Sequence, residues 1–195
     1  MGLDCTAYYN CKYIGKGSYD EDEDVWRMLN GSALCRTLNY VEVYEHSLVD
    51  FPASSKGMLA GLYSYEDEKL WCAGSYTGYN HCRDALAKMA GYTPDTSFAE
   101  NSMASRFPHT ASVRKVQSGP FHSLLYFSDC DGVIGTEACG ILANDFQTYD
   151  TKACQMRDVL NNEDGINNGD HWYDLYRMWR DSCEFASHNG FIVFH

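Results

Sequence analysis

The sequence is short of basic residues and has no hydrophobic run long enough to cross a membrane. Its 195 residues include 15 lysines and arginines against 27 aspartates and glutamates, a formal net charge of −12. Proteins bind DNA or RNA largely by neutralising phosphates with lysine and arginine, so this balance argues against non-specific nucleic-acid binding. It argues equally against an anionic membrane surface. We therefore expect neither a nucleic acid nor a membrane as a partner.

Metal-binding and targeting patterns are also missing. No two of the nine cysteines are spaced as Cys-x-x-Cys, and no two of the seven histidines as His-x-x-x-His. Structural zinc and zincin-type sites therefore have no sequence support, and we expect no resident cofactor. The odd number of scattered cysteines is typical of reduced, buried thiols in a cytosolic protein. Residues 1–20 lack a basic start followed by an apolar run, so no signal peptide is expected.

Hydrophobic and aromatic side chains, in contrast, are plentiful. The chain is 45% hydrophobic and 14% aromatic, and 15 of its residues are tyrosine. These values are typical of one folded domain with a well-buried core. The tyrosines could line a surface or cleft, or simply fill a half-buried sheet.

Hydrophobic periodicity predicts a single α+β domain over residues 1–195, with a mostly antiparallel sheet, about three helices on one face and a long flap. The expected strands are 4–15, 40–46, 61–65, 70–73, 121–127 and 191–195, with 61–73 forming a hairpin. The expected helices are a short one within 25–38, one ending at Gly91, one from Thr136 and one from Asp170 that ends at His188-Asn189-Gly190. There, Gly190 is expected to be the left-handed residue.

The inward faces of these helices are predicted from spacing. They carry Cys82, Leu86 and Met89 in the first; Ala138, Ile141, Leu142, Phe146 and Tyr149 in the second; and Trp172, Tyr176, Trp179 and Cys183 in the third. Residues 92–120 have little periodicity and hold the locally basic stretch RFPHTASVRK. A loop of this length is often functional, so we expect a flap there.

The stretch GSYTGYNHCRDAL is the first candidate site. A strand that turns through glycines into a helix presents unpaired backbone N–H groups, which together with the helix dipole favour an anion. Hydroxyls could add donors, tyrosine rings could stack on a base, and an arginine one turn on could reach a phosphate. The predicted ligand-binding residues are Gly74, Ser75, Tyr76, Thr77, Gly78, Tyr79, Asn80 and Arg83. The alternative is a plain strand-to-helix turn capped by Asn80.

A second candidate is the turn SDCDG. Asp129 and Asp131 could accept hydrogen bonds from ribose hydroxyls, ligate a divalent metal or act as an acid/base pair. The metal alternative adds His195, provided that the last strand pairs beside 121–127. An ordinary Asx-type turn is the other explanation of these carboxylates. No nucleophile arrangement emerges, and no catalytic residue is assigned.

Four segments together resemble a set of short proteins of tailed bacteriophages and prophages. They are MGLDCTAYY, GSYTGYN, FSDCDGVIG and HNGFIVFH. Members of that set typically begin MGLD-x-x-AY, carry G-S-Y-[ST]-G-Y-N and F-S-D-C-[DE]-G-x-I-G, and finish N-G-x-x-x-F-H. This chain departs at Thr77 where serine is usual, at Asp131 where glutamate is common, and at Thr136 where proline is expected. The resemblance implies the cytoplasm of an infected bacterium as the setting.

Loop chemistry and setting together predict a phage accessory protein that sequesters a small nucleotide-derived anion, a host immune second messenger, and so counters antiviral signalling. Homo-oligomerisation would help, because a ligand trapped between subunits is shielded from water. One alternative is a metal-dependent phosphodiesterase that uses Asp129 and Asp131. Another is an acidic decoy that binds a host enzyme through residues 20–24, as a nucleic-acid mimic.

Overall fold

The computed structural model describes residues 2–49, 52–99, 102–127, 132–164 and 168–195. Within these ranges the strands form three antiparallel sheets. The four-stranded sheet has the order β7 (Asp67–Ser75), β1 (Gly2–Tyr9), β9 (Phe191–Phe194), β8 (Gly132–Gly135). The three-stranded sheet has the order β2 (Lys12–Gly15), β6 (Gly61–Tyr65), β5 (Asn39–Val43). A hairpin of β3 (Gly17–Asp20) and β4 (Val25–Met28) makes the third.

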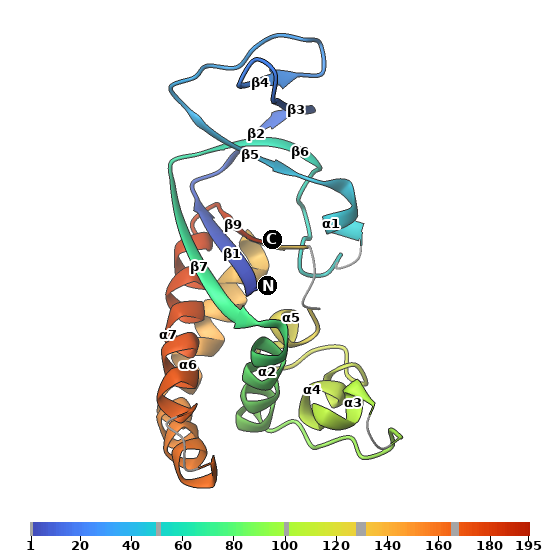
Figure 1. Ribbon diagram of the computed structural model, residues 1–195, viewed down its shortest axis with the longest axis vertical. Helices are drawn as coiled ribbons and strands as arrows, with labels where there is room; N and C mark the ends of the chain where they lie inside the picture. Colours follow the sequence, from blue (N-terminus) through green and yellow to red (C-terminus); the bar gives the residue numbers. More distant parts are fainter. Residues whose placement is uncertain (1, 50–51, 100–101, 128–131, 165–167) are drawn as a thin grey trace.

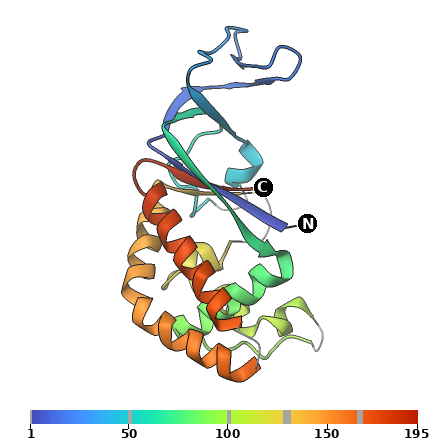
Figure 2. The ribbon, with the colours of Figure 1, turned by 60° about the vertical axis from the view of Figure 1, so that its left-hand side comes forward.

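The described helices are α1 (Glu45–Val49), α2 (Tyr76–Ala90), α3 (Met103–Arg106), α4 (Pro108–Val113), α5 (His122–Leu125), α6 (Thr136–Asp164) and α7 (Asn168–Ala186). Four of them, α2, α5, α6 and α7, cover one face of the four-stranded sheet. Helices α6 and α7 lie side by side as a long pair (Figures 1 and 2). Alternate strand residues such as Ala7, Ile134 and Ile192 point into one large core with side chains of α2, α5, α6 and α7. Burial of this shared apolar surface is what holds the helices against the sheet.

The opposite face of the same sheet packs on the three-stranded sheet. Tyr8, Val133 and Phe191 alternate with the residues of the helical core and join Val43 and Tyr63 in a second cluster. This is the two-residue period of a strand with both faces covered. The β3–β4 hairpin lies beyond this second layer, at the end of the molecule opposite to α3 and α4 (Figure 1).

The α+β class and the antiparallel sheets are confirmed, although the described residues form seven helices rather than about three. The helix ending at Gly91 is confirmed, because Gly91 has a φ of 94° and closes α2. The helix from Thr136 is confirmed, but Ile141 is 54% exposed and not on the inner side. The final strand is confirmed as β9.

Four element predictions are wrong. The expected strand 4–15 is two strands, β1 and β2, which belong to different sheets. Residues 121–127 contain helix α5 rather than a strand, because a short apolar run does not distinguish a strand from a buried helical turn. Residues 25–28 form strand β4 rather than part of a helix. The segment 61–73 is not a hairpin, since β6 joins the three-stranded sheet and β7 the four-stranded one.

The predicted flap at 92–120 contains two short helices, and α4 packs against α2. The buried side chain of Asp95 anchors this segment. Its carboxylate lies 2.6 Å from Lys115 Nζ and accepts hydrogen bonds from the N–H and hydroxyl groups of Ser97. The backbone N–H of Asp95 donates to the carbonyl oxygen of Pro108. These contacts tie the described parts of the segment near residues 95–97, 108 and 115 to one another.

These contacts predict a pH dependence of the 92–120 segment. The Lys115 ion pair and the Ser97 hydrogen bonds lower the pKa of Asp95 from 3.8 to about 2. A lowered folded-state pKa stabilises the segment above pH 3.8, and this contribution is lost as the pH falls to about 2. We expect amide exchange here, corrected for its intrinsic pH dependence, to accelerate between those values. Asp95→Asn should show the faster exchange already at pH 7, and equal exchange in both proteins would contradict the anchor.

No helix within the described residues is long and apolar enough to span a bilayer.

Candidate functional site

Strand β7 runs directly into helix α2 at the predicted glycine-rich turn. Gly74 adopts a φ of 98°, which favours glycine, and Ser75 is the N-cap of α2. The Ser75 hydroxyl oxygen accepts a hydrogen bond from Gly78 N–H at 3.1 Å. The N–H groups of Tyr76 and Thr77, in the first turn, have no intrahelical acceptor. The turn therefore exists as predicted, and its cap is Ser75 rather than Asn80.

A groove of about 420 Å³ borders this turn. Helix α2 forms one wall and the first half of α7 forms the other, and Leu160 of α6 also lines the groove. Its lining residues are Ala73, Gly74, Ser75, Gly78, His81, Cys82, Ala85, Leu160, Asn168, His171, Trp172 and Leu175. The volume lies in the range of pockets that hold small ligands, roughly 300–1,000 Å³.

The predicted binding residues divide between the groove, the surface and the core. Gly74, Ser75 and Gly78 line the groove. Tyr76, which is 38% exposed, and Thr77 lie on the surface of the same turn. Their predicted contacts with a ligand stay predictions.

Tyr79 and Arg83 lie on the core side of α2. Tyr79 is 1% exposed and packs beside Trp179 and Phe194, so its ring cannot stack on a ligand base without unpacking the core. Arg83 is 6% exposed and donates to the carbonyl oxygen of Leu125. A second nitrogen donates to Asn80 Oδ1, and the guanidinium lies over the Tyr79 ring. The phosphate-binding role predicted for Arg83 does not agree with this burial.

Helix α7 supplies groove residues that were not among the predicted binding residues. The indole N–H of Trp172 donates to the carbonyl oxygen of Cys82 at 3.1 Å, which joins α7 to α2 beneath the groove. His171, one position earlier, is exposed and lines the groove. Leu175, one turn later, is mostly buried and also lines it. The helical spacing of Trp172 indicated an inward face, but nothing in the sequence indicated that this face meets α2.

The remaining groove side chains favour binding over covalent chemistry. Burial raises the pKa of the Cys82 thiol to about 12, so it is protonated at neutral pH and a poor nucleophile. The exposed ring of His81 packs edge-on against Phe107, with 5.0 Å between ring centroids. The groove thus combines two imidazoles and backbone N–H groups with an apolar wall.

The second predicted site is only partly described. Asp129 and Asp131 lie outside the described residues. The imidazole of His195 lies 3.0 Å from the Thr6 hydroxyl, and the backbone N–H of His195 donates to the Asp4 carbonyl oxygen. The last strand pairs with β8 rather than with residues 121–127. Within the described ranges, no three His, Cys, Asp or Glu side chains gather in a metal-binding arrangement.

The cap of α2 gives a stability prediction for the turn. Ser75→Ala removes the acceptor of Gly78 N–H and should lower the free energy of unfolding by about 1 kcal/mol, the usual value of an N-cap. Ser75→Asp, which restores the acceptor, should recover most of that loss. Denaturant unfolding measures both. Equal stability of the alanine variant and the unchanged protein would contradict the cap.

Comparison with known proteins adds no assignment. No protein family, curated protein or solved structure matches the chain.

Proposed function

We propose that the protein binds and sequesters a small nucleotide-derived anion in the groove between α2 and α7. The observation that carries this proposal is the groove itself, which lies against the start of α2 where Gly74, Ser75 and Gly78 border it. A helix N-terminus attracts negative charge through its unpaired N–H groups and its dipole. The groove gives such a charge a place to reside.

The wall chemistry supports a ligand with both an anionic and an apolar part. The start of α2 and the imidazoles of His81 and His171 supply donors for phosphate oxygens. Leu160, Trp172 and Leu175 supply the apolar surface that a nucleobase would cover. A ligand of this kind would contact both the hydrogen-bond donors and the apolar residues of the groove, whereas inorganic phosphate would leave the apolar residues uncovered.

The biological setting extends the proposal. The resemblance to phage proteins supports the cytoplasm of an infected bacterium as the proposed setting, where nucleotide second messengers activate antiviral effectors. Sequestering such a messenger would counter that signalling. A homo-oligomer that closes the groove with a second subunit would hold the ligand more tightly by excluding water.

Mass spectrometry of released small molecules tests the proposal. The protein is incubated with cyclic dinucleotides and ADP-ribose, separated from unbound ligand and denatured by heat. Recovery of an intact nucleotide at a stoichiometry near the number of grooves supports sequestration. Recovery of a converted nucleotide, with the conversion suppressed by EDTA, would instead favour the metal-dependent phosphodiesterase that uses Asp129 and Asp131. Retention of neither would contradict nucleotide binding.

A further inference from the structure

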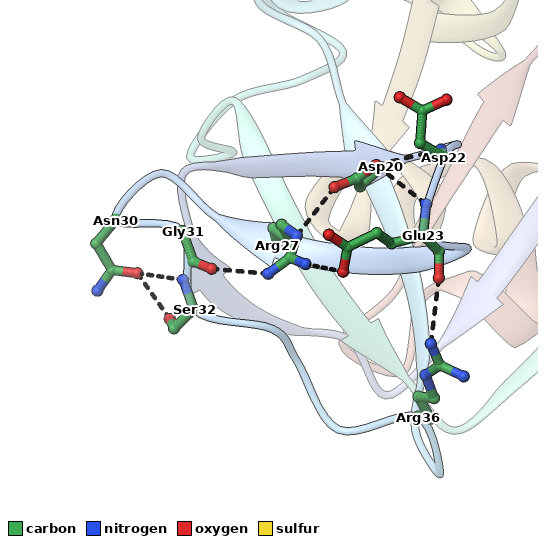
Figure 3. A network of polar contacts seen from close by, with 8 residues as sticks. All are labelled: Asp20, Asp22, Glu23, Arg27, Asn30, Gly31, Ser32 and Arg36. Carbon is green, nitrogen blue, oxygen red and sulfur yellow. Dashed lines mark hydrogen bonds and ion pairs between the residues drawn. The ribbon is translucent and has the colours of Figure 1, made fainter.

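The β3–β4 hairpin carries a strongly acidic turn that is held in one conformation. Figure 3 shows Arg27 of strand β4 at the centre of the network of polar contacts around this turn. The Arg27 guanidinium donates to Asp20 Oδ2 at 2.9 Å, to the Glu23 carboxylate and to the Gly31 carbonyl oxygen at 2.9 Å. Asp20 in turn accepts from the N–H groups of Asp22 and Glu23. The turn is therefore ordered before any partner arrives.

The segment after β4 folds back and completes a wall beside the hairpin. Leu34 N–H donates to the Trp26 carbonyl oxygen at 2.8 Å, and Met28 N–H donates to that of Ser32 at 2.9 Å. Arg36 donates to the Glu23 carbonyl oxygen at 3.1 Å, which ties the returning segment to the acidic turn (Figure 3). Together these contacts build a fixed concave surface where the hairpin meets β5.

A pocket of about 400 Å³ occupies this surface. Four aromatic rings line it, those of Tyr19, Trp26, Tyr40 and Tyr65. The Trp26 ring is tilted against two of them, with centroids 5.1 Å from Tyr19 and 6.5 Å from Tyr40. Asp24 lies at the same pocket, and its carboxylate accepts a hydrogen bond from the Tyr19 hydroxyl. Aromatic faces beside a carboxylate attract an organic cation, because the ring quadrupole and the charge act in the same direction.

The charge balance of the hairpin points the same way. Five carboxylates at positions 20–24 face two guanidiniums, Arg27 and Arg36, so this end of the molecule is negative. Arg36 lines the pocket and opposes a cation there, but its guanidinium is tethered to the Glu23 carbonyl oxygen. The pocket's apolar lining includes Leu38, which is 54% exposed, and Leu29 nearby in the chain is 82% exposed. An aromatic centre with a polar rim is typical of a protein interface, and the acidic character of this rim favours a cationic partner.

We infer that the pocket formed by Tyr19, Trp26, Asp24 and Tyr40 is a docking site for a lysine or arginine side chain of a partner protein. The cationic head lies among the rings beside Asp24, and the aliphatic stem covers Leu38. This inference is independent of the α2–α7 groove. It also differs from nucleic-acid mimicry, because Arg27 holds two of the carboxylates of the acidic run and the rings supply the specificity.

A nuclear magnetic resonance titration with a basic peptide tests the inference. The probe is acetyl-Gly-Arg-Lys-Arg-Gly-amide, and the same peptide with glutamate at the three basic positions is its counterpart. The basic probe should shift the Trp26 indole resonance in a saturable manner, and the acidic probe should leave it in place. Equal binding of the two probes, shifts caused by the acidic probe alone, or no shift with either would overturn the inference.

Two variants with the same change in charge separate the pocket from the general field of the hairpin. Asp24→Asn removes the pocket carboxylate and keeps the φ of 52°, which asparagine tolerates. Glu21→Gln removes a carboxylate of the same turn that does not line the pocket. Affinity for the basic probe should fall about threefold to fivefold in the first and stay nearly unchanged in the second. Equal losses in both would overturn the pocket.

A ring variant completes the test. Tyr19 is 41% exposed, so Tyr19→Leu should leave the fold intact while removing one face of the pocket. Affinity for the basic probe should fall by roughly fivefold, within the range of a cation–π contact. Unchanged affinity in a folded Tyr19→Leu protein would overturn the assignment of the rings.

Discussion

Gly190→Ala should lower the free energy of unfolding by about 3 kcal/mol, at the upper end of the usual cost of overpacking. A Cβ at this position would lie 1.9 Å from the Tyr8 carbonyl oxygen and 3.1 Å from that of Ala186. Neither backbone can easily withdraw. Tyr8 lies in a strand bonded on both sides, and the neighbouring chain is fixed by the hydrogen bonds from Asn10 and Cys11 N–H to the carbonyl oxygens of His188 and Asn189.

Thermal and denaturant unfolding measure this loss. A decrease of that size corresponds to a fall in the midpoint temperature of roughly 10 °C for a chain of this length. Gly140→Ala, within helix α6, is the matched control. A Cβ at Gly140 would contact only the Ser187 side chain, at 3.9 Å. It should raise stability by about 0.5 kcal/mol, because alanine favours a helix over glycine. A Gly190→Ala protein as stable as this control would contradict the close packing of β1 on the end of α7.

His171→Glu should weaken retention of an anionic ligand at least tenfold, about 1.4 kcal/mol of binding free energy. The substitution places a carboxylate in the groove beside the proposed ligand and removes an imidazole donor. Because His171 is exposed in the first turn of α7, the fold should be unaffected or slightly stabilised by the negative charge near a helix N-terminus. Equilibrium dialysis with the nucleotide recovered from the protein measures the change.

His188→Glu is the charge-matched control for this variant. His188 is also exposed, but it follows the C-terminal end of α7 and does not line the groove. Retention should be the same as in the unchanged protein. Equal weakening in both variants would mean that only the overall charge matters, and unchanged retention in His171→Glu would remove the groove as the binding place.

Local signals in the sequence predicted the elements that local rules govern. Gly91, with its φ of 94°, ends α2 as expected. The alternation of residues 40–46 predicted a strand, which is confirmed up to Val43 as β5, whereas helix α1 begins at Glu45. The end of α7 was assigned to the wrong residue, because Asn189 rather than Gly190 takes the left-handed conformation, with a φ of 56°. Gly190 is there for close approach to β1, a tertiary requirement that the helix-ending pattern does not contain.

In the candidate site, too, local sequence patterns predicted the local structure but not the tertiary contacts. The strand-to-helix turn at Gly74–Gly78 follows from glycine and hydroxyl residues close together in the chain. The burial of Tyr79 and Arg83 depends on which side of α2 meets α5 and α7, and helical spacing alone did not fix that side. Trp172 and Leu175 reach the groove from a helix almost 100 residues away in the chain, so no local pattern pairs them with Ser75.

The most direct test of the groove is amide shift mapping of the ¹⁵N-labelled protein during titration with ADP-ribose or a cyclic dinucleotide. If the start of α2 holds the anion, the amide resonances of Tyr76, Thr77 and Gly78 should move together with those of residues 168–175. Shifts confined to other surfaces, or none at millimolar nucleotide, would contradict the account.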